Sequence, residues 1–112
     1  MSLFKKEPAI ETVLEIPVLC KLWTEDGVVN GVAEGLDVAV FGADFDEAKA
    51  NLADAIIGHL EALQELGKLD QVIEELRSRA REDRLTIESL PLNQTVYKFA
   101  ATRHNRHILA LA

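Results

Sequence analysis

The chain has 112 residues, a length that suits one domain with a modest two-layer core. Hydrophobic residues make up 48% of it and charged residues 28%, a composition typical of globular proteins rather than of disordered chains. The formal net charge of -7 argues against general binding to nucleic acid phosphates or to anionic membranes.

The negative charge lies mainly in the first two-thirds of the chain. Residues 1–43 carry a net charge of -4 and residues 44–66 a net charge of -5, whereas residues 67–84 are balanced and residues 85–112 carry +2. This acidic part could attract a basic partner, although a solvated acidic surface is the more common explanation. No apolar run approaches the length of a membrane span and no signal-peptide pattern opens the chain, so we expect a cytoplasmic protein.

The first predicted strand lies within residues 12–23. Pro17 divides this stretch, and residues 18–23 form the stronger part because apolar side chains alternate onto one side, with Trp23 on the other. Cys20 is the only cysteine of the chain, so there is no internal disulfide. Its apolar surroundings predict a buried, inert thiol rather than a nucleophile.

Two tight turns connect this strand to two more. The dipeptide Asp26-Gly27 predicts a hairpin into a strand at residues 28–33, and a turn around Gly35 leads to a short strand at residues 38–41. Strands joined this closely form an antiparallel meander. Such a sheet commonly leaves one face to water while a helix covers the other.

The strongest helix signal in the chain covers residues 44–66. Asp44 predicts an N-cap with Glu47 as its capping-box partner, Asp46 adds negative charge to the first turn, and Gly67 predicts a C-cap. Apolar residues recur at steps of three and four, which places them on one face. The residues of that face are Phe45, Ala48, Leu52, Ile56, His59, Leu60, Leu63 and Leu66, with His59 expected at the edge of the core.

The last third of the chain predicts a shorter, highly charged helix from Leu69 to about Arg84, followed by strand-like sequence. Two segments, residues 85–90 and 95–100, are candidates for a fourth strand. The chain closes on an apolar run that would fray if left alone in water. We therefore expect a homodimer or higher homo-oligomer in which residues 95–112 contact a second subunit, or else a tail that folds back on its own sheet.

Four features follow one another between residues 18 and 69. They are a turn in which an acidic residue precedes Asp-Gly, a second turn with glycine, a strand ending at a glycine, and a capped helix. The residues of this pattern are Trp23, Glu25, Asp26, Gly27, Ala33, Gly35, Gly42, Glu47, Ala48, Asn51, Ala55 and Ile56. The pattern resembles the HicB-type antitoxin domain over about half of the chain. The resemblance implies a partial ribonuclease-H-like fold, in which a fourth strand pairs beside the first, and a non-enzymatic binding protein that neutralises a small basic ribonuclease toxin of the HicA type.

The chain departs from that family in two places. The turn around Gly35 lacks the usual proline, and residues from Leu69 onward do not resemble the DNA-binding module with which such antitoxins often end. DNA binding is therefore not part of the prediction. The sequence predicts a single α+β domain over residues 1–112, with a core at 12–69 and an extension at 70–112. Its parts are a three-stranded antiparallel meander, a main helix packed on one face, a second shorter helix and a fourth strand.

The competing class is an enzyme, a divergent metal-dependent nuclease of ribonuclease-H-like fold. Such an enzyme needs three or four carboxylates that converge on two metal ions. Asp26, Asp37, Asp44 and Asp46 are available, but the first two lie in predicted turns and the other two are explained by helix-start electrostatics. We expect no catalytic, cofactor-binding or metal-binding residues.

Three other features have both a functional and a structural explanation. His104 and His107 have a spacing that could ligate a metal on a helix, but no acidic or thiol partner lies nearby in the sequence. Trp23 and Phe41 could form an interaction patch, although packing under the helix is the default for large apolar side chains. The chain could also be an orphan oligomeric module without any toxin partner.

Overall fold

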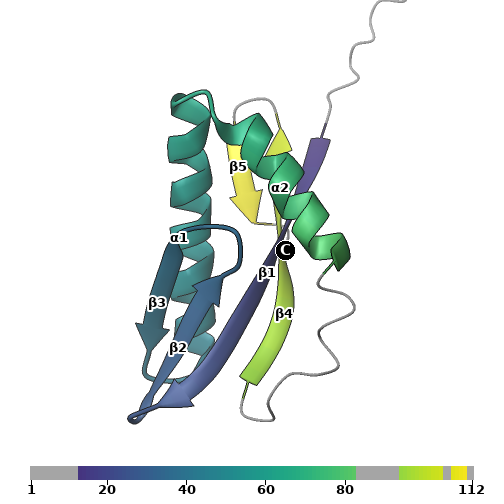
Figure 1. Ribbon diagram of the computed structural model, residues 1–112. Helices are drawn as coiled ribbons and strands as arrows, with labels where there is room; N and C mark the ends of the chain where they lie inside the picture. Colours follow the sequence, from purple (N-terminus) through teal and green to yellow (C-terminus); the bar gives the residue numbers. More distant parts are fainter. Residues whose placement is uncertain (1–12, 83–93, 105–106, 111–112) are drawn as a thin grey trace, which may run out of the picture.

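Seven elements make up the computed structural model, which describes residues 13–82, 94–104 and 107–110 (Figure 1). The fold is α+β, as the sequence predicts. The elements in chain order are β1 (Val13–Glu25), β2 (Val28–Ala33), β3 (Val38–Gly42), α1 (Phe45–Glu65), α2 (Leu69–Glu82), β4 (Gln94–His104) and β5 (His107–Ala110).

The strands form one curled antiparallel sheet in the order β3-β2-β1-β4-β5. A fourth strand beside the first is confirmed, and it contains the candidate segment 95–100; the other candidate, 85–90, lies outside the described residues. The expected number of strands is wrong, because the described residues alone form a sheet of five. Residues 107–110 turn back on β4 in a register that pairs His104 with His107 and Ala101 with Ala110. This hairpin buries Ile108, which a frayed tail would expose.

The two turns of the meander have the backbone geometry that their residues predict. Asp26 and Gly27 both have positive φ angles, 56° and 80°, which is the requirement of the two-residue hairpin turn that matches strand twist. Gly35, in the second turn, has a φ of 87°. The strand between them covers Val28–Ala33 as predicted, and β3 extends one residue beyond the predicted end, to Gly42.

Pro17 does not divide β1, contrary to the expectation from sequence. Strand β4 pairs with β1 from Val13 to Trp23, but β2 pairs only from Cys20 onward, so the first half of β1 has a strand on one side only. On the other side the Leu19 carbonyl accepts a hydrogen bond of 2.8 Å from the Glu34 N–H. The Pro17 nitrogen points to that same side, two residues earlier, where no strand requires its missing N–H. Proline is therefore tolerated inside a long strand.

Helix α2 occupies the place beside the first half of β1 that β2 leaves vacant (Figure 1). The Arg77 guanidinium on α2 donates a hydrogen bond of 3.2 Å to the carbonyl of Glu15 on β1. Leu69, Ile73 and Leu76 turn inward from α2 and are 2–3% exposed. The helix thus satisfies part of a strand edge and at the same time closes the core.

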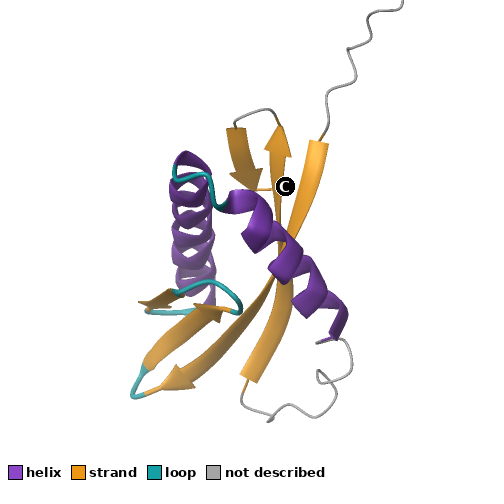
Figure 2. Cartoon of the chain, turned by 45° about the horizontal axis from the view of Figure 1, so that its top comes forward, coloured by secondary structure: helices purple, strands orange, loops and turns teal. Residues whose placement is uncertain are grey.

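Helix α1 lies across the meander and also contacts β5 (Figure 2). At its start, Asp44 accepts a hydrogen bond of 2.8 Å from the Glu47 N–H, and the Glu47 carboxylate accepts one from the Ala43 N–H. The N-cap is confirmed, although the return bond reaches the residue before the cap rather than the cap itself. At its end, Gly67 has a φ of 73°, and hydrogen bonds join Lys68 N–H to Leu63 and Gly67 N–H to Gln64, the pattern of a Schellman motif.

The core lies between one face of the sheet and the two helices. Phe45 and Leu66, expected on the buried face of α1, are 42% and 68% exposed and stand at the two ends of the helix. His59 is half-buried at the edge, as expected. The buried cluster comprises Ile16, Val18, Cys20, Leu22, Val29, Ala33, Ala48, Leu52, Ile56, Leu60, Leu69, Ile73, Leu76, Ala101 and Ile108.

Candidate protein-binding face

The four carboxylates considered for a nuclease do not come together. Asp26 and Asp37 lie in the turns at opposite ends of β2, while Asp44 caps α1 and Asp46 lies in its first turn. Within the part of the chain that the structure describes, no group of three or more His, Cys, Asp and Glu side chains could hold a metal ion. A nuclease of the two-metal type requires such convergence.

The cysteine and the C-terminal histidines have structural positions. Burial raises the pKa of the Cys20 thiol from 9.0 to about 11, and hydrogen bonds to Tyr97 and to the Phe99 backbone offset only part of the rise. Cys20 is fully buried in the core, as predicted, and a thiol with this pKa is protonated at neutral pH. His104 and His107 face each other across the β4–β5 hairpin instead of sharing a helical turn.

Trp23 and Phe41 lie on the sheet face opposite the one that α1 covers. Leu22 is fully buried and Gly42 is buried against α1, so their neighbours Trp23 and Phe41 must point to the opposite face. Phe41 is 68% exposed, while Trp23 is half-buried. The expectation that both pack under the helix is therefore wrong, and the reason is the two-residue period of a strand, which fixes their direction through Leu22 and Gly42.

The two aromatic side chains stand in one row across three strands. Trp23 pairs with Asn30, and Asn30 pairs with Phe41, so only the asparagine separates them. The indole N–H of Trp23 donates a hydrogen bond of 3.2 Å to Glu25, which holds the ring in place. The neighbouring positions of the same face are small or apolar on β2 and β3, whereas β1 carries the charged residues Lys21 and Glu25, which pair with Val32 and Val28. We name this surface the aromatic face, and its residues are Trp23, Val28, Asn30, Val32, Ala39 and Phe41.

Acidic residues surround the aromatic face. From Leu22 to Ala48 the chain has seven acidic residues and no basic residue. Glu25 and Asp26 are exposed at the β1–β2 turn. The exposed residues at the start of α1 lie at the same end of the sheet, because the last residue of β3 pairs with Val29 near the start of β2. The aromatic face is therefore a largely apolar surface with an acidic rim, in which Glu34 is paired with Lys21 at 3.3 Å.

Comparisons of the chain with protein-family models, with curated proteins and with solved structures found no match. Among the helices of the described residues, none is long and apolar enough to cross a membrane.

Proposed function

We propose that this protein is a non-enzymatic binding module whose aromatic face docks a small basic protein. The observation that carries the proposal is Phe41, a large aromatic side chain that is 68% exposed in register with Trp23. Aromatic side chains that a partner can desolvate are enriched at the centres of protein interfaces. The acidic rim would speed association with a partner of opposite charge and would disfavour acidic competitors.

The resemblance to HicB-type antitoxins suggests which basic protein this is. Trp23, Glu25, Asp26, Gly27 and Gly42 belong to that resemblance, and all of them lie in or beside the aromatic face or its rim. We propose a small ribonuclease toxin of the HicA type as the partner and a partial ribonuclease-H-like fold for the antitoxin. A protein that handles RNA is basic because it must bind phosphates, and this supports the match in charge.

The competing nuclease function has less support, because its candidate carboxylates lie apart.

Self-association remains part of our proposal. Strand β5 forms one edge of the sheet, and Leu109 on that strand is 59% exposed. An unpaired strand edge is a template for another chain, and most homo-oligomers are two-fold symmetric. We therefore propose a homodimer that pairs through this edge.

The binding function is tested with the purified product of a neighbouring toxin-like reading frame. Phe41→Ala should weaken binding of this basic protein at least tenfold, as loss of an interface anchor does, and should release its ribonuclease activity. Leu66→Ala is the matched control, because Leu66 is also 68% exposed but lies at the far end of α1. Calorimetry gives the two affinities.

Two results would contradict the proposed docking site. One is equal affinity of wild-type protein and Phe41→Ala for the toxin. The other is an equal loss of affinity in the Leu66→Ala control. Both variants remove exposed side chains, so their urea unfolding midpoints should stay close to that of the wild type.

A further inference from the structure

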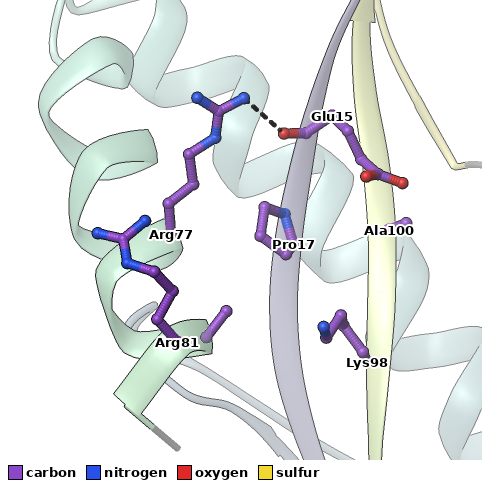
Figure 3. A pocket seen from close by; sticks show the side chains of 7 residues that line it. Glu15, Pro17, Arg77, Arg81, Lys98 and Ala100 are labelled. Atoms are coloured by element: carbon purple, nitrogen blue, oxygen red, sulfur yellow. Dashed lines mark hydrogen bonds between the residues drawn. The ribbon is translucent and has the colours of Figure 1, made fainter. Parts of the chain in front are cut away.

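A small open pocket lies between α2 and the strands β1 and β4 (Figure 3). Its floor consists of short side chains: Pro17 on β1, Ala100 directly opposite on β4, and Ala80 on α2. Longer side chains at these three positions would fill the space. The cavity measures about 260 Å³, which is below the range of typical drug-sized ligand sites. The site therefore suits a small group rather than a large molecule.

Charged side chains form the rim of this pocket. Arg77 and Arg81 come from successive turns of α2, Lys98 comes from β4, and Glu15 is the one acidic residue, so the lining carries a net charge of +2 in a protein with a net charge of -7. Such a concentration of like charge needs a reason, because neighbouring cations repel one another. Within the described residues, no hydrogen bond or ion pair occupies Arg81 or Lys98.

Arg77 is held in position for binding. One nitrogen of its guanidinium donates to the Glu15 carbonyl at 3.2 Å, as Figure 3 shows, and this anchors the side chain beside the strand. A guanidinium has five N–H donors in a planar fork that matches the oxygen atoms of phosphate. A single hydrogen bond to a carbonyl leaves most of these donors available. The cost of ordering a long side chain is already met in the free protein.

We propose that this pocket binds a phosphate group, either free or as a small phosphomonoester. At neutral pH such a group carries a charge of about -1.5 to -2, which neutralises the lining, whereas a carboxylate would supply only half of this charge. The pocket lies beside Glu15 and Pro17, and the aromatic face lies at the other end of β1. The proposal is therefore independent of the toxin-binding function.

The test is a titration of the full chain with inorganic phosphate and with glycerol phosphate, followed by NMR of backbone amides at constant ionic strength. Saturable shifts should appear at Ala80 and Ala100. Arg81→Gln should weaken binding about tenfold, the effect of losing one charge-assisted hydrogen bond. Arg79→Gln is the matched control: it removes the same charge from the same helix, but Arg79 lies over Gly35 and does not line the pocket.

The two ligands identify the source of the phosphate group. Tighter binding of glycerol phosphate indicates an ester, and tighter binding of the inorganic ion indicates free phosphate. Absence of saturable shifts with both ligands would overturn the proposal. An equal loss of affinity in Arg79→Gln and Arg81→Gln would also overturn it, because general charge attraction would then explain the binding.

Discussion

Replacement of Gly42 by alanine should destabilise the fold through a contact with backbone atoms. Gly42 ends β3, and a Cβ atom there would lie 2.6 Å from the Ala48 nitrogen, 3.0 Å from the Ala48 Cα and 3.0 Å from the Glu47 carbonyl carbon. These atoms belong to the first turn of α1, so no side-chain rotation can relieve the overlap. The helix start must move, together with the cap at Asp44. Overpacking of a buried site costs about 1–3 kcal/mol, and we expect the upper part of this range.

Gly58 offers the same chemical change in open surroundings. It is an exposed residue inside α1, and a Cβ atom there would meet nothing within 4 Å. Alanine at this position should stabilise the protein by about 0.5–1 kcal/mol, because glycine is a poor helix former. The two variants should therefore differ by about 3 kcal/mol in the free energy of unfolding, as measured by urea denaturation followed by circular dichroism. If Gly42→Ala unfolds at the wild-type midpoint, the tight contact between β3 and α1 does not exist in solution.

Two further predictions concern Cys20 and Leu109. Burial raises the pKa of Cys20 from 9.0 to about 11. The stability that the protonated thiol contributes is therefore complete below pH 9 and is lost as the pH rises toward 11. The urea midpoint should fall across this interval, and it should fall less in Cys20→Ala. An equal fall in both proteins would contradict this assignment. Leu109→Lys should convert the proposed homodimer to a monomer in sedimentation experiments without unfolding it, because the side chain is 59% exposed at a sheet edge. A wild-type chain that sediments as a monomer refutes the homodimer.

The elements that the sequence predicts well are those encoded by neighbouring residues. The hairpin at Asp26-Gly27 needs two positive φ angles, and an Asp-Gly pair is among the residues that adopt them most easily. The ends of α1 are fixed by Asp44 and Gly67, each within three or four residues of the groups they cap. Local signals of this kind do not depend on the rest of the fold, and a reading of the sequence recovers them.

The features that the sequence does not reveal depend on contacts between distant segments. Pro17 looks like a break until α2 is placed beside it, and the hydrogen bond that anchors the helix joins residues 62 positions apart, Arg77 and Glu15. The direction of the Phe41 side chain follows from the alternation of side chains along β3, in which the neighbouring Gly42 faces α1. Five residues are too few to show from composition which positions of this strand face the core. The pocket likewise forms only because the fold brings Ala80 of α2 and Ala100 of β4 to its lining, and no local sequence pattern predicts this. Tertiary packing decides each of these.

The two ends of β1 carry surfaces of opposite charge, which explains how an acidic protein can present a site for an anion. Trp23 on the aromatic face lies six residues further along β1 than Pro17 at the pocket, a span of about 20 Å along a strand. That distance is about two and a half times the Debye length at physiological ionic strength, so the acidic residues at the β1–β2 turn and at the start of α1 are largely screened from the pocket. Glu34 lies nearer, beside Leu19, but it is paired with Lys21 at 3.3 Å. The net charge of the whole chain therefore predicts little about either surface. We therefore expect Phe41→Ala to weaken binding of the toxin but not of phosphate, and Arg81→Gln to weaken binding of phosphate but not of the toxin. Failure of one proposal leaves the other standing.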